Sequence, residues 1–561
     1  MSDPRPRSKV LALFGLAVIA LAGAAEAASE STWRAELREL ARSLVATHPA
    51  PFTKIGPRAF EQRLALLERE LPRLAEEERV VRAMELVALL GDGHTTLLPK
   101  SPAFGSWYPF RAYELSDGYF VTSAHESAAE LAGARILELG GRPVAEVAAR
   151  ARALCGADNA FGASENLYPL SNAGLMRGLR VVGEDGLLLA KLVATDGRIL
   201  ERRLAPLDGP ASFEWRFRSE VFGPPVGELG AWVSAYGHTS AMAFRTADRR
   251  RPLHLVYRRA FVAVPLPEQK AYYVQVNFVA DGPDESFRAF FQRVAAEVEA
   301  QRPEKLILDL RYNAGGDGSL VSEVLRDLRS RLDQPPWRRP FLLVGRKTFS
   351  AAVQLVDAFL DGTGASVVGE PAGAPLEMAG DPVSISFPGT GLELQVSTYF
   401  HHLGRSDDLG PHLRVDVPAP LSSADYLAGR DPAVDDILSG EEMRSLPAVA
   451  AELGGAAARR VYQQRARKHG HLSWWTAADE HALNQAGNQL RDAERKADAL
   501  EVYRLNAEIH PSSWRAWENL GDGQLDTGDR AGALASYRRG LTLNPESEAL
   551  RQAIVRLEGG G

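Results

Sequence analysis

The sequence predicts a multi-domain α/β protein, and three observations support this fold class. Predicted strands and helices alternate through residues 272–368, which is typical of a largely parallel sheet covered by helices. Helical periodicity dominates residues 29–90, and a 34-residue repeat occupies the end of the chain. The chain has 561 residues, 45% of them hydrophobic, so it is long enough to bury several cores.

Composition excludes several classes of protein. The formal net charge is −7 and the basic residues are scattered, so no nucleic-acid surface is predicted. Cys155 is the single cysteine, which excludes an intramolecular disulfide framework and any metal cluster held by several cysteines.

Residues 1–27 have the pattern of a secretory signal peptide. Basic residues come first, an apolar run covers residues 10–22, and a small-residue stretch ends in an Ala-x-Ala site at Ala27. We therefore expect an exported protein, periplasmic or secreted, with no membrane span after the signal is removed. The alternative is that residues 10–25 remain as an uncleaved membrane anchor.

A helical subdomain is predicted for residues 29–100. Pro49 and Pro51 separate the first two helices, and Gly91 ends the third. The apolar stripes of these helices are Trp33, Leu37, Leu40, Leu44 and Val45; Phe60, Leu64, Leu67 and Leu71; and Val80, Met84 and Val87.

A β-rich region is predicted for residues 101–264, because the hydrophobic period shortens toward two and Asp-Gly pairs supply turn signals. Residues 134–139 are predicted to form a strand. This strand is expected to turn at Gly140-Gly141 into a returning strand at residues 142–144.

The α/β core is predicted for residues 265–440. Its first helix carries an aromatic stripe at helical spacing, which is typical of a face buried against a sheet. The expected strands are 272–279, 306–310, 341–344 and 366–368, and the expected helices are 284–300, 319–331 and 350–360.

The C-terminal part is predicted to contain a linker, residues 441–477, and a repeat region, residues 478–561. Lys496–Tyr503 is echoed 34 residues later by Arg530–Tyr537, and a proline closes each unit. This period and composition are the signature of tetratricopeptide repeats, although a generic helical tail is the alternative. Two such repeats would present a concave groove to a peptide or a partner protein.

Two segments of the predicted core could carry chemistry. Gly315 and Gly316 follow a buried strand, and glycine tolerates backbone angles that leave amide N–H groups facing an anion. Ser350 lies between a strand and a helix, where its hydroxyl would be exposed and the amide of Ala351 free to donate. Each segment also fits a simpler interpretation: a plain strand-to-helix turn for the glycines and an ordinary N-cap for the serine.

Together, Asp309–Gly316 and Thr348–Ala352 resemble segments of the tail-specific protease family, the C-terminal processing peptidases related to tricorn protease. The resemblance covers roughly residues 36–438. It implies a PDZ-like region within residues 101–264 and an α/β protease core of the ClpP/crotonase-like type within residues 265–440.

The resemblance also implies a serine hydrolase. Ser350 would be the nucleophile, and the amides of Ala351 and of Gly315 or Gly316 would form the oxyanion hole. Further stretches that are similar to the family are residues 91–95, 134–147, 367–373 and 426–436.

The resemblance implies His94 as the general base. The bacterial branch of the family uses a lysine after its serine, but Pro375 stands there and no lysine occurs between Lys347 and Lys468. The tricorn-like branch uses a histidine from the N-terminal region, and His94 matches its place, although Gly93 replaces the serine that precedes it in that branch. A neutral imidazole can take the serine proton and return it to the leaving amine.

The tricorn-like branch also has an acidic residue late in the domain. Asp408 is the candidate here, with Asp407 and Glu370 as alternatives. Three histidines lie between residues 401 and 412, but their spacing matches no metal motif, and a solvated loop is predicted there.

We therefore expect an exported serine peptidase that cleaves extended or unfolded polypeptides through an acyl-enzyme on Ser350. The repeats would recruit a substrate or a partner protein, and no metal or organic cofactor is implied. The main alternative is a catalytically inactive protein of the same fold that binds a peptide or an apolar ligand, as the related interphotoreceptor retinoid-binding proteins do. A third possibility is a scaffold in which only the repeats matter.

Overall fold

The computed structural model of the chain describes residues 28–209, 232–234, 260–329, 339–403, 410–440 and 442–559. The predicted signal peptide, residues 1–27, lies outside these ranges. Among the helices within them, none combines the length and the apolar character needed to cross a membrane.

A six-stranded sheet forms the centre of the core, in the order β18-β13-β12-β11-β10-β9. Neighbouring strands from β18 to β10 are parallel, and β9 pairs antiparallel with β10 at one edge. The largely parallel sheet predicted from the alternation of strands and helices is confirmed. The strands are β9 (Phe261–Leu266), β10 (Ala271–Val276), β11 (Lys305–Asp309), β12 (Arg339–Val344), β13 (Ser366–Gly369) and β18 (Val417–Pro418), and the connecting helices are α8 (Phe287–Gln301), α9 (Gly318–Arg329) and α10 (Ala351–Thr363).

Apolar side chains cover both faces of this sheet, because successive residues of a buried strand point to opposite sides. Leu306 and Leu308 of β11 belong to the hydrophobic cluster that contains α8 and α10. Ile307 belongs to a second cluster, which contains α12 (Pro432–Ser439). The stripe predicted on the first core helix is buried in α8: Phe287, Phe290, Phe291, Val294 and Val298.

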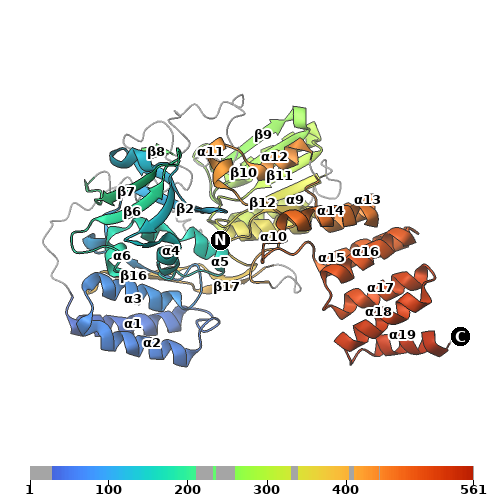
Figure 1. Cartoon of the computed structure of the whole chain (residues 1–561), viewed down its shortest axis with the longest axis horizontal. Coiled ribbons are helices and arrows are strands. Elements are labelled where there is room, and N and C mark those ends of the chain that lie inside the picture. The colour runs from blue at the N-terminus through green and yellow to red at the C-terminus, as the bar shows by residue number, and fades with distance from the viewer. Residues whose placement is uncertain are drawn as a thin grey trace, which may run out of the picture.

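The N-terminal helices are tied to the core by strand pairing. A hairpin extends from the core and consists of β15 (Val383–Phe387) and β16 (Leu392–Val396). Strand β16 pairs antiparallel with β1 (Thr96–Pro99) (Figure 1). The chain leaves and re-enters the core through the pair β14 (Glu377–Gly380) and β17 (Tyr399–His402). This arrangement fixes the loop before β1 against a segment that lies far later in the sequence. The helices are α1 (Glu30–Thr47), α2 (Pro57–Glu70) and α3 (Glu76–Ala88).

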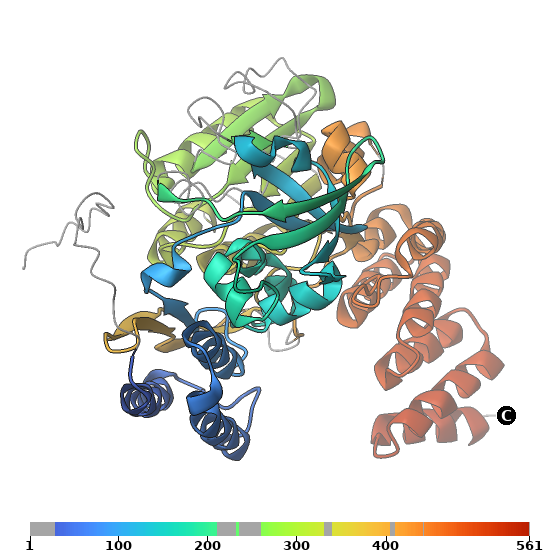
Figure 2. The same cartoon turned by 60° about the vertical axis from the view of Figure 1, so that its left-hand side comes forward.

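The predicted β-rich region contains a sheet in the order β2-β3-β4-β6-β7, and Figure 2 shows it beside the core. The expected returning strand is shorter than predicted, because β5 covers only Arg142–Pro143 and a helix begins at Val144. Apolar residues at helical spacing after Val144 account for this correction. The elements are β2 (Phe110–Leu115), β3 (Gly118–His125), β4 (Arg135–Leu139), α4 (Val144–Arg152), α5 (Ala160–Glu165), α6 (Ala173–Gly178), β6 (Leu188–Val193), β7 (Ile199–Leu204) and β8 (Trp232–Ser234).

The C-terminal part is a stack of helices that projects away from the core (Figure 1). Residues 441–477, expected to be a linker, contain two helices that share a hydrophobic cluster with the helices that follow. The 34-residue period recurs in the packing, because Gly487 lies against the ring of Tyr503 and Gly521 against the ring of Tyr537. The helices are α13 (Leu446–Leu453), α14 (Gly455–His469), α15 (Glu480–Asp492), α16 (Lys496–Ile509), α17 (Trp514–Asp526), α18 (Arg530–Leu543) and α19 (Glu548–Gly559).

Candidate active site

Ser350 occupies a strained turn between β12 and α10. Its backbone has φ 55° and ψ −131°, in the region that favours glycine, and its side chain makes no N-cap hydrogen bond. A non-glycine residue in such a conformation costs on the order of 1–3 kcal/mol and persists only where the surrounding structure holds it. The geometry therefore separates Ser350 from an ordinary capping serine, and it leaves the hydroxyl without a partner on its own helix.

Two buried polar residues hold this turn in place. The hydroxyl of Thr348 donates to the carbonyl of Leu310 at 2.9 Å and accepts from the amide of Gly345 at 3.0 Å. The amide of Phe349 donates to the carbonyl of Asn313 at 3.1 Å. The segment before Ser350 is thus fastened to the end of β11, which brings the two sequence segments together.

The two glycines after β11 have different roles in this geometry. The amide of Gly315 donates to Asn313 Oδ1 at 2.8 Å, so this N–H is already used within the loop. A Cβ atom on Gly315 would lie 2.5 Å from Ser350 Cβ, which shows how closely the loop backbone approaches the serine. In the described part of the chain, the N–H groups of Gly316 and Ala351 donate to no other group.

His94 lies beside the serine turn. Its imidazole stacks on the ring of Phe349, the residue before Ser350, with the ring centroids 4.3 Å apart and the planes inclined by 30°. Within the described residues neither ring nitrogen makes a hydrogen bond of standard geometry, although Nδ1 lies 4.0 Å from Asp92 Oδ1 and the backbone of Ala379 raises the pKa of the ring; 9% of the side chain is exposed. Burial lowers the pKa of His94; the negative charge of Asp92 opposes this shift and His401 adds to it. The ring is therefore neutral at neutral pH and has a free lone pair.

Asp92 holds the loop that carries His94. Its Oδ2 accepts hydrogen bonds from His48 Nε2 at 3.0 Å, Thr95 Oγ1 at 2.5 Å and Ser397 Oγ at 2.6 Å, and its Oδ1 accepts the amide of His94 at 2.9 Å. Burial opposes ionisation of Asp92, but these hydrogen bonds outweigh it and lower the pKa to about 2. Asp92 is thus a fixed negative charge that joins helix α1, the His94 loop and the segment after β16.

A second carboxylate lies close to His94. Asp158 Oδ2 accepts the amide of Gly93 at 3.2 Å, and one atom each of Asp92, His94 and Asp158 lie within 4.8 Å of one another. Three such groups can in principle hold a metal ion. The four hydrogen bonds to Asp92 instead identify this cluster as a hydrogen-bonded support for the histidine.

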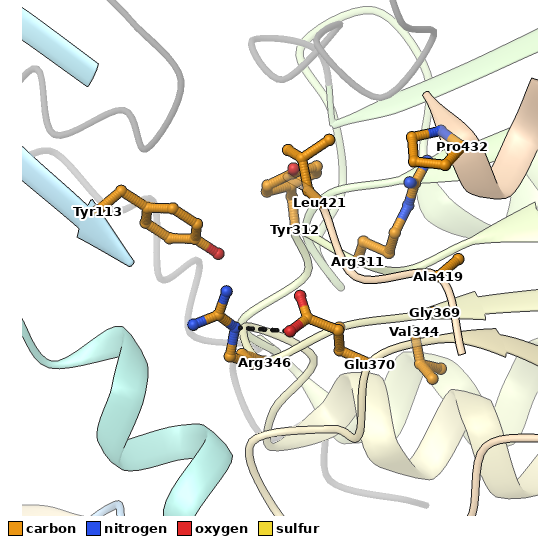
Figure 3. Close-up of a pocket in the computed structure, with 11 residues that line it drawn as sticks. Tyr113, Arg311, Tyr312, Val344, Arg346, Gly369, Glu370, Ala419, Leu421 and Pro432 are labelled. Atoms are coloured by element: carbon orange, nitrogen blue, oxygen red, sulfur yellow. Dashed lines mark ion pairs between the residues drawn. The ribbon is translucent and has the colours of Figure 1, made fainter. Parts of the chain in front are cut away.

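Of the acidic candidates from the sequence, the structure describes only Glu370. Glu370 lines a pocket between the β-rich region and the core, where its carboxylate faces Arg346 at 3.4 Å (Figure 3). Burial raises the pKa of Glu370, and Arg346 opposes this shift. Asp407 and Asp408 lie outside the described residues.

Sequence reasoning missed three residues at this site. Asp92 lies within the Gly-Asp-Gly-His-Thr segment, so its position next to His94 was the available signal. Asp158 and Ser397 belong to no motif, and only the packing of distant segments brings them to the His94 loop.

Several solved structures are similar to this chain. Mature CPAF complexed with lactacystin matches 73% of this chain and 98% of its own, with a TM-score of 0.50 and 13% identity. A CPAF mutant matches the same shares with a TM-score of 0.51 and 13% identity. The photosystem II D1 C-terminal processing protease matches 72% of this chain and 98% of its own at 14% identity, with a TM-score of 0.33. The CPAF matches show that this chain shares the mixed α/β fold of those structures.

Two curated proteins match a short segment of the sequence. Over 72 residues the chain is 36% identical to protein O-mannosyl-transferase TMTC1 of Homo sapiens and 33% identical to the Mus musculus protein. These matches cover 13% of this chain and 8% of each relative. No family model matches the chain.

Proposed function

We propose that this chain is a serine peptidase that cleaves extended or unfolded polypeptides, with Ser350 as the nucleophile. The observation that carries the proposal is the strained conformation of Ser350 at the start of α10, packed closely against Gly315; within the described residues, the amides of Ala351 and of Gly316, which follows Gly315, donate to no other group. Strained strand-to-helix turns are a recurring way to expose a nucleophilic serine. The likeness of the fold to CPAF supports the same class of activity.

The reaction follows from the groups around Ser350. His94, neutral because of its burial, takes the hydroxyl proton as the serine oxygen attacks the substrate carbonyl. The amides of Gly316 and Ala351 donate to the oxyanion that forms, whereas the amide of Gly315 is held by Asn313. His94 then gives the proton to the leaving amine, and water releases the acyl group by the reverse sequence.

Because His94 is stacked on Phe349, we take this arrangement of the site to be its resting state. Since the ring lies on Phe349 and no hydrogen bond joins it to Ser350 in the part of the chain that is described, His94 must turn off Phe349 to take the proton. Catalytic hydrogen bonds often tighten only when substrate binds. We infer that occupancy of the site by a polypeptide displaces the stack.

The proposal extends to location and recruitment. The signal-like residues 1–27 support export to the periplasm or the medium, which N-terminal sequencing of the exported protein would test by finding a chain that begins at Ala28. The matched packing of Gly487 with Tyr503 and of Gly521 with Tyr537 supports two tetratricopeptide repeats. Repeats of this kind would recruit a polypeptide substrate or a partner protein.

A fluorophosphonate probe tests the nucleophile. Labelling of the purified chain is expected at Ser350, and Ser350→Ala should abolish it. Ser422→Ala is the matched control, because Ser422 caps α11 (Ser423–Ala428) with an ordinary φ of −87° and a capping hydrogen bond. Labelling that persists in Ser350→Ala, or a folded wild-type chain that never labels, would contradict the proposal and favour a binding protein on the same fold.

A further inference from the structure

Asp158 lies beside the loop that carries His94, close to the ring of Phe349. It precedes α5 in the β-rich region, and its carboxylate reaches the loop that carries His94. A Cβ atom on Gly93 would lie 2.7 Å from Asp158 Oδ2 and equally close to two ring carbons of Phe349. The carboxylate of Asp158 and the ring of Phe349 therefore both lie close to the Cα atom of Gly93, beside the imidazole that stacks on Phe349.

The two carboxylates near His94 are not equivalent. Asp92 accepts four hydrogen bonds, three of them from side chains, so its orientation is fixed by the fold. Within the described residues the carboxylate of Asp158 accepts one hydrogen bond, from the amide of Gly93. Asp158 thus keeps an oxygen available to a ring N–H of His94, which makes no hydrogen bond of standard geometry to the described residues, lies 4.0 Å from Asp92 Oδ1 and is influenced by the backbone of Ala379.

We propose that Asp158 is the acidic partner of His94, a positioning residue that accepts a ring N–H once the imidazole turns toward Ser350. This inference rests on the proposed peptidase function. In the reaction, the O–H bond of Ser350 breaks, its proton moves to the ring nitrogen that faces the serine, and the serine oxygen bonds to the substrate carbonyl carbon. Asp158 takes no proton in this step; its negative charge stabilises the imidazolium.

The charges around the pair define its pH dependence. His94 faces Asp92, His401 and Asp381 as well as Asp158. Burial raises the pKa of Asp158 to about 8 and the charge of Asp92 adds to this, while the amide of Gly93 and the ammonium of Lys54 oppose it. The carboxylate is therefore formed mainly above pH 8 in the resting site, and the reactivity of Ser350 should rise as the pH passes this value.

The test is the rate of fluorophosphonate labelling as a function of pH in the full chain. Asp158→Asn keeps an oxygen for Gly93 but carries no charge, and we expect it to lower the rate at pH 8.5 by about 100-fold and to remove the rise near pH 8. Asp158→Glu should restore part of the rate and the rise. Asn159→Ala is the control for structural damage, because Asn159 caps α5 and donates to the carbonyl of Ala372, yet it contributes no charge.

The outcomes separate this inference from the peptidase proposal. If wild type labels at Ser350 and Asp158→Asn labels at the same rate with the same pH profile, Asp158 is not the partner of His94. Asp158 is also not that partner if Asn159→Ala reproduces the loss of rate and of the rise near pH 8. If wild type does not label at all, the peptidase proposal itself fails.

Discussion

The imidazole of His94 stacks on the phenyl ring of Phe349 at 4.3 Å, one residue before Ser350. The contact joins the N-terminal helical part to the core, because the amide of Phe349 donates to Asn313 in the loop after β11 and the amide of His94 donates to Asp92. It places the proposed general base beside the proposed nucleophile but directs it onto an apolar ring. In the described structure, no hydrogen bond therefore joins the proposed base to the proposed nucleophile.

Removing the stacking ring should make the serine more reactive. Phe349→Leu keeps apolar bulk but loses the stack, which is worth about 1 kcal/mol, so the rate of fluorophosphonate labelling should rise about 5-fold. Phe52→Leu is the control, since the Phe52 ring contacts Phe60 in the N-terminal helices. A labelling rate that falls in Phe349→Leu would mean that the ring supports the reactive position of His94.

A methyl group at Gly315 should disable the site. Its Cβ would lie 2.5 Å from Ser350 Cβ and 3.0 Å from the nitrogen of Ala351, so Gly315→Ala must displace the serine turn. Gly141→Ala is a matched control, because Gly141 also has a positive φ, 72°, but has open space around it. Urea unfolding should show a loss of about 1 kcal/mol in the control and a larger loss in Gly315→Ala, which should also lose labelling. Equal losses in both variants would contradict the close packing of Gly315 on Ser350.

Ser397 should stabilise the fold through Asp92. Because the pKa of Asp92 is lowered to about 2 in the folded chain, its ionisation contributes stability that is present above its ordinary value of 3.8 and is lost as the pH falls toward 2. Ser397→Ala removes a hydrogen bond to the ionised carboxylate and should cost about 2 kcal/mol at pH 7. Urea unfolding at a series of pH values should show this deficit shrinking below pH 4; a deficit independent of pH would mean that Ser397 acts through packing alone.

Asp158 should lower the stability of the folded chain at high pH, where its carboxyl group is ionised. The pKa of Asp158 is raised from its ordinary value of 3.8 to about 8 in the folded chain. Its ionisation therefore destabilises the folded state increasingly as the pH rises from 3.8 to 8. Asp158→Asn should therefore be more stable than wild type at pH 8.5, by more than about 1 kcal/mol, and differ little near pH 3.5. Urea unfolding at the two pH values checks this, and a variant that is less stable at pH 8.5 would contradict it.

The local sequence pattern was sufficient to predict the helices and strands of the core. The spacing of Phe287, Phe290 and Phe291 predicted a buried helix face, and all three are buried in α8. The strand before Gly315 and the helix after Ser350 were predicted in the same way, and their ends meet because carboxyl ends of parallel strands share one edge of a sheet. The short returning strand at Arg142–Pro143 shows the limit, since the turn forms as predicted but helical spacing from Val144 ends the strand after two residues.

The sequence by itself determined the order of strands and helices in the core and the serine turn between β12 and α10, because hydrophobic spacing and turn residues act over a few neighbouring positions. Only the tertiary structure decided what surrounds His94. Glu370 faces Arg346 in a separate pocket, whereas Asp92, Asp158 and Ser397 gather around the histidine loop. Asp158 and Ser397 come from segments that are far from His94 in the chain. Their meeting depends on the pairing of β1 with β16 and on the packing of the β-rich region against the core, which no local pattern encodes.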